Sequence, residues 1–89
     1  MKAVILYRPN SEHGRAVDEF VHEFSRLYPD IRLELLNIDG RDGSATASLY
    51  DIVSYPAILA LQNDGSASMV WQDAELPLID EVASYVRAA

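Results

Sequence analysis

The chain has 89 residues, enough for one domain with a single modest core and too few for two. About half of the residues are apolar, so we expect a folded, soluble protein rather than a disordered one. Seven basic and fourteen acidic side chains give a formal charge of -7, which disfavours nucleic acids and anionic membranes as partners. The absence of cysteine excludes disulfides, zinc-thiolate sites and thiolate nucleophiles.

The first half of the chain predicts a strand, a helix and a second strand. The apolar run from Ala3 to Tyr7 is typical of a strand buried on both faces. Ser11 is a suitable cap for a helix whose apolar residues recur at three-four spacing as far as Tyr28. Alternating apolar residues at 31–38 predict the second strand, which runs parallel to the first because a helix connects them.

The second half predicts a short helix, a hairpin and a last helix. Ser44 is the expected cap of the short helix, which ends near Val53. Apolar runs at 57–61 and 68–71 flank a glycine turn and predict an antiparallel hairpin, and apolar residues from Leu78 to Val86 recur at helical spacing. We therefore predict a single α/β domain over residues 1–89, of order βαβαββα, with a four-stranded mixed sheet of order 2-1-3-4 and helices on both faces.

Three segments of the chain resemble the thioredoxin superfamily, and the length is closest to that of a glutaredoxin. The segment from Leu6 to Pro9 resembles the end of the first glutaredoxin strand. The segment from Tyr50 to Ala57 resembles the valine and cis-proline segment of the family, and the hairpin at Asn63 to Gly65 resembles the one that follows it. The resemblance implies a thioredoxin-like fold in which the bond before Pro56 is cis.

The same resemblance locates the place of the family's C-x-x-C motif. At the start of the first helix, Ser11 stands in the position of the nucleophilic cysteine and Gly14 in that of the resolving cysteine. This departure removes the thiol-disulfide activity of the family, because an unassisted serine hydroxyl is not acidic enough to replace a thiol. Ser11 as a nucleophile also lacks a base, since Glu12 and His13 are one and two residues away and do not face it on a helix.

The retained frame without its nucleophile predicts a redox-inactive module that binds a protein or peptide and is not an enzyme. An extended peptide would pair with the Tyr55 backbone beside Pro56, with the Tyr55 ring as an aromatic anchor. The predicted binding surface consists of residues at the helix start and in this loop: Ser11, Glu12, His13, Gly14, Arg15, Tyr55 and Pro56. The alternative is a protein that binds glutathione or another small thiol, of the glutaredoxin or glutathione transferase type, with Ser11 orienting the thiolate.

We predict no metal and no cofactor. His13 and His22 lie about two and a half helical turns apart and cannot hold one ion together. The aspartates at 39, 42 and 64 lie in turns and lack the spacing of a calcium loop.

The short apolar run at the start of the chain does not have the length of a signal peptide core or a membrane span, so we expect a cytoplasmic protein. Homodimerisation through an edge strand is a further option.

Overall fold

A computed structural model describes residues 2–72 and 76–88 of the chain. Its elements are β1 (Lys2–Tyr7), α1 (Gly14–Leu27), β2 (Arg32–Asn37), α2 (Arg41–Leu49), β3 (Ala57–Leu61), β4 (Ala67–Trp71) and α3 (Ile79–Ala88). The predicted βαβαββα order is confirmed.

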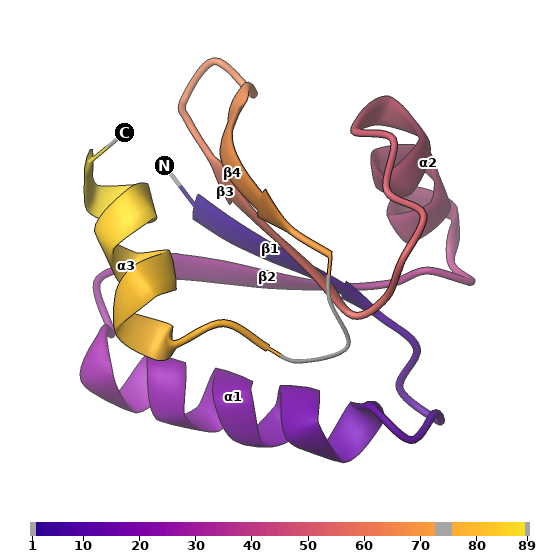
Figure 1. The fold of residues 1–89 in the computed structure, drawn as a ribbon, viewed down its shortest axis with the longest axis horizontal. Coiled ribbons are helices and arrows are strands. Elements are labelled where there is room, and N and C mark those ends of the chain that lie inside the picture. Colours follow the sequence, from indigo (N-terminus) through magenta and orange to yellow (C-terminus); the bar gives the residue numbers. More distant parts are fainter. Residues whose placement is uncertain (1, 73–75, 89) are drawn as a thin grey trace.

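The four strands form one mixed sheet of order β2-β1-β3-β4, as predicted (Figure 1). β1 runs parallel to β2 and antiparallel to β3, and β3 pairs antiparallel with β4. β1 and β3 are the two inner strands, and this explains why both are continuous apolar runs, with residues 3–6 and 57–61 buried.

Two apolar layers hold the helices to opposite faces of the sheet. α1 and α3 pack on one face and α2 covers the other (Figure 1). Because side chains alternate along a strand, Ala3 and Ile5 of β1 join the α1–α3 layer, while Val4 and Leu6 join the α2 layer. Helices on both faces were predicted, and this prediction is confirmed.

Both predicted helix caps are wrong by a few residues. α1 begins at Gly14 with His13 at the N-cap, and Ser11 lies in the turn before it, where its hydroxyl donates to the Arg8 carbonyl at 2.6 Å. Ser44 lies inside α2, since its N–H donates to the Gly40 carbonyl at 2.9 Å. In each case a buried glycine in the first turn decides where the helix begins, because it allows the helix to start against the backbone that precedes it.

α2 ends at a left-handed residue that leads into the loop before β3. Asp51 has a φ of 55°, its N–H donates to the Ser48 carbonyl at 3.4 Å, and the N–H of Ile52 donates to the Ala47 carbonyl at 2.8 Å. This is the Schellman pattern of hydrogen bonds at a helix C-terminus. The helix therefore ends at Leu49, before the predicted end near Val53, and buries Ile52 under the sheet.

Candidate functional site

A hollow of about 310 Å³ lies where β1 ends, between the start of α1 and the loop before β3. It contains five of the seven predicted binding-surface residues: Ser11, Glu12, His13, Tyr55 and Pro56. The helix start and the proline loop are more than forty residues apart in the chain, and the antiparallel pairing of β1 with β3 brings them together. Two further residues, Arg8 and Ile38, complete the lining.

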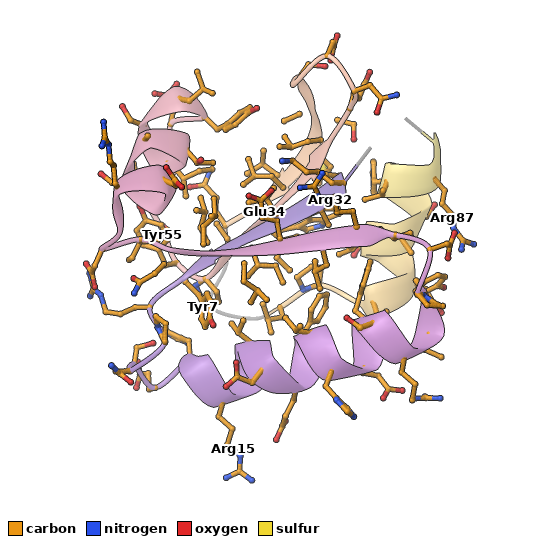
Figure 2. All side chains as sticks on the ribbon, turned by 180° about the vertical axis from the view of Figure 1, so that it is seen from behind. Tyr7, Arg15, Arg32, Glu34, Tyr55 and Arg87 are labelled. Carbon is orange, nitrogen blue, oxygen red and sulfur yellow. The ribbon has the colours of Figure 1, made fainter. Side chains whose placement is uncertain are left out.

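The other two predicted residues lie outside the hollow. Gly14 is buried, and a Cβ atom on it would lie 2.1 Å from the Pro9 carbonyl oxygen, so this position is closed to any side chain. The Arg15 side chain is 91 % exposed and pairs with Glu19, with 3.3 Å between Nε and Oε1. Figure 2 shows Arg15 pointing away from the body of the molecule.

Arg8 is the polar residue of the hollow that the sequence analysis missed. Its guanidinium forms a two-bond ion pair with the Asp39 carboxylate, at 3.0 Å from Nε to Oδ2 and 3.2 Å from Nη2 to Oδ1. The hydrogen bond and the charge of Asp39 raise the pKa of Arg8 above its ordinary value. The register of the parallel strands was the signal: Tyr7 lies opposite Asn37, so the residues that follow each strand meet at one edge of the sheet.

Ser11 is hydrogen-bonded within its own turn. Its Oγ donates to the Arg8 carbonyl at 2.6 Å and accepts from the His13 N–H at 3.3 Å. The His13 Nε2 lies 3.6 Å from Glu12 Oε1 and not against the serine. The hydroxyl therefore shapes the loop that enters α1, and no base in the described residues is hydrogen-bonded to it, as a nucleophile would require.

The loop from Val53 to Pro56 forms the opposite wall. The Tyr55–Pro56 peptide bond is cis. The Gln72 Oε1 accepts hydrogen bonds from the N–H groups of Val53 at 2.9 Å and Ser54 at 3.4 Å. The Tyr55 hydroxyl donates to the Ile52 carbonyl at 3.4 Å. Within residues 2–72 and 76–88, the backbone N–H of Tyr55 donates no hydrogen bond and its C=O accepts none.

The described residues contain neither a metal-binding cluster nor a membrane-spanning helix. No three His, Asp or Glu side chains there come together in a group that would hold a metal ion. No helix in that part of the chain has the length and apolar character needed to cross a membrane.

No protein-family model matches the chain, and no curated protein does. Among solved structures it is similar to thioredoxin 1 from Thermosipho africanus, with 14 % identity, a TM-score of 0.70, and coverage of 99 % of this chain and 92 % of that one. It is also similar to thioredoxin O1 from Arabidopsis thaliana, with 18 % identity, a TM-score of 0.71, and coverage of 98 % of this chain and 75 % of that one. At these identities the likeness shows a common fold.

Proposed function

We propose that this chain, which has a thioredoxin-like fold and no cysteine, is a redox-inactive module that binds a protein or peptide in the hollow between α1 and the Tyr55–Pro56 loop. The observation that carries the proposal is the backbone of Tyr55, which lies at the wall of this hollow and forms no hydrogen bond within residues 2–72 and 76–88. An extended peptide gains affinity from main-chain hydrogen bonds and specificity from a neighbouring pocket. Both elements are present at one place in the molecule.

The composition of the hollow suits a peptide side chain. Its lining combines the apolar Ile38, Tyr55 and Pro56 with the polar Arg8, Ser11, Glu12 and His13. Protein interfaces likewise combine apolar contacts with polar groups. Because Asp39 already neutralises Arg8 and Glu12 is 88 % exposed, the hollow favours a partner with a neutral or basic residue beside its anchor.

Two features of the chain argue against thiol-disulfide exchange. The chain has no sulfur nucleophile of its own. In addition, the position of the resolving cysteine is occupied by Gly14, whose Cβ would collide with the backbone of Pro9. The backbone at the helix start is therefore adapted to a residue without a side chain.

The alternative, binding of glutathione or another small thiol, stays a prediction that no specific observation favours. It assigns the Ser11 hydroxyl as the donor to a thiolate, whereas this hydroxyl donates to the Arg8 carbonyl at 2.6 Å. A thiolate would have to replace that bond. The proposal also includes a protein or peptide as the partner, no nucleic-acid or membrane partner, and a cytoplasmic location. Dimerisation through an edge strand, β2 or β4, is a further option that sedimentation measurements would test.

The experiment is a selection of displayed peptides on the immobilised protein, followed by affinity measurements on matched variants. Tyr55→Ala and His13→Ala remove side chains of the hollow. Arg15→Ala and His22→Ala remove exposed side chains of α1 that lie outside it. We expect the selected peptides to lose at least about tenfold in affinity for Tyr55→Ala, as for an aromatic anchor, and to be unaffected by the two controls.

Two results would count against the proposal. One is a selection that yields no peptide binding above background. The other is a set of peptides that bind wild type, Tyr55→Ala and His13→Ala with the same affinity.

A further inference from the structure

A second, smaller hollow lies at the opposite end of the sheet, where β1 and β2 begin and β3 ends. It has a volume of about 190 Å³ and is lined by Lys2, Arg32, Gln62 and Asn63. We call it the Lys2–Arg32 pocket. Three separate chain segments contribute to it: Lys2 and Arg32 are the first residues of their strands and direct neighbours in the parallel register, and Lys2 also faces Leu61, just before Gln62.

The pocket carries positive charge on an acidic protein. Like charges directly opposite each other on neighbouring strands repel, so the Lys2–Arg32 register is unfavourable by itself. One carboxylate, Glu34, pairs with Lys2 at 2.7 Å between Oε2 and Nζ, and this hydrogen bond lowers the pKa of Glu34. Glu34 thus stays ionised at neutral pH and balances one of the two cations, whereas the whole chain carries a formal charge of -7.

Arg32 is the second cation of the pocket and forms no ion pair within the described residues, although its charge helps to lower the pKa of Glu34. Within the described residues, five of the seven Lys and Arg side chains form ion pairs with Asp or Glu, and Arg32 is not among them. Its side chain is exposed, and Figure 2 shows it beside Glu34 on the α2 side of β2. The Asp64 carboxylate, which follows Asn63 in the chain, does not line the pocket and accepts two hydrogen bonds from Ser66, at 2.9 Å from the backbone N–H and 2.7 Å from the hydroxyl.

We propose that the Lys2–Arg32 pocket binds a phosphate-type oxyanion, either inorganic phosphate or the terminal group of a small phosphomonoester. A guanidinium offers several donors in a planar fork that fits two oxygens of such a group, and the ammonium of Lys2 adds a point charge beside it. The Gln62 amide is a further donor at the rim. The volume equals that of roughly six water molecules at about 30 Å³ each, which is room for a tetrahedral anion together with part of its hydration.

The site is independent of the peptide hollow, because the two share no lining residue.

The test is an NMR titration of the ¹⁵N-labelled protein at constant ionic strength with inorganic phosphate, glycerol phosphate and acetate in separate arms. We expect saturable shifts of the amides of Arg32, Gln62 and Asn63 at millimolar phosphate and weaker binding of acetate. Tighter binding of glycerol phosphate than of phosphate would identify the ester as the ligand, and equal binding would identify the free anion.

The matched variants are Arg32→Gln and Arg41→Gln. Both remove an exposed arginine that has no ion pair within the described residues, but only Arg32 lines the pocket. Arg32→Gln should weaken phosphate binding about tenfold, as expected for the loss of hydrogen bonds to a charged group, while Arg41→Gln leaves it unchanged. The proposal is wrong if the shifts do not saturate, if acetate binds as tightly as phosphate, or if the two variants behave alike.

Discussion

Gly14 provides the sharpest test of how the start of α1 is built. In Gly14→Ala, the new Cβ would lie 2.1 Å from the Pro9 carbonyl oxygen and 3.0 Å from its carbon, whereas ordinary contacts begin at 3.4 Å. The colliding group is backbone and cannot rotate away, so α1 and the Pro9 turn must separate by more than an ångström. A contact this short with backbone belongs at the upper end of the range for overpacking, about 2–3 kcal/mol, against a gain of about 1 kcal/mol in helix propensity for alanine over glycine.

We therefore expect Gly14→Ala to lower the free energy of unfolding by about 1–2 kcal/mol, measured by urea denaturation followed by circular dichroism. Gly40→Ala is the control, because its Cβ would approach Asn37 O only to 3.2 Å and should change stability by less than about 1 kcal/mol. Adding Gly14→Cys to Ser11→Cys, which restores the cysteine pair, should destabilise the protein relative to Ser11→Cys alone. A Gly14→Ala variant as stable as wild type would show that the Pro9 carbonyl does not restrict this position.

Three other changes test the core, the end of α2 and the pH dependence of stability. Phe24→Ala removes a fully buried ring and should cost about 3–5 kcal/mol in urea denaturation, and a loss below about 1 kcal/mol would contradict the assigned core. Asp51→Gly relieves the left-handed backbone and should raise the melting temperature by stabilising the fold by about 0.5–1 kcal/mol, and a decrease would contradict the Schellman geometry. The hydrogen bond from Lys2 lowers the pKa of Glu34 in the folded protein, so its contribution to stability is complete above about pH 4.5 and is lost as the pH falls through the folded pKa. Glu34→Gln should therefore flatten the dependence of unfolding free energy on pH in that acidic range. An unchanged pH dependence would show that the ion pair contributes nothing.

Much of the fold follows from apolar patterning. The uninterrupted apolar runs of β1 and β3 identify the two inner strands, and the helical connection between β1 and β2 requires them to be parallel. The element order and the sheet order 2-1-3-4 were predicted on this basis and are confirmed. These features depend on the burial of many residues, so no single local preference alters them.

The helix starts were not predicted correctly, because each depends on one contact with another segment of the chain. Ser11 and Ser44 have the chemistry of N-caps, but the two glycines that lie against Pro9 and Asn37 determine where α1 and α2 begin. The distance between these segments is known only from the folded structure, so the sequence alone does not reveal such contacts. Sequence preferences for caps are too weak, at about 1 kcal/mol, to override them.

The sequence indicated some of the residues that line the hollow and missed others, because the lining also depends on contacts between distant segments of the chain. Ser11, His13 and Tyr55 were assigned from the resemblance, and the structure brings them to one hollow. Arg8 was missed because its partner, Asp39, had been interpreted only as a turn residue. Arg15 was included by its position in the chain, yet α1 directs it away from the hollow.

Peptide binding in the hollow is tested most directly by an NMR titration of the ¹⁵N-labelled protein with a peptide obtained from the selection. We expect saturable shifts of the amides of Ser11, Glu12, His13 and Tyr55, with the largest at Tyr55, and no shifts at Arg32 or Gln62 at the other end of the sheet. Shifts confined to residues outside the hollow, or an unperturbed Tyr55 amide in the saturated complex, would contradict it.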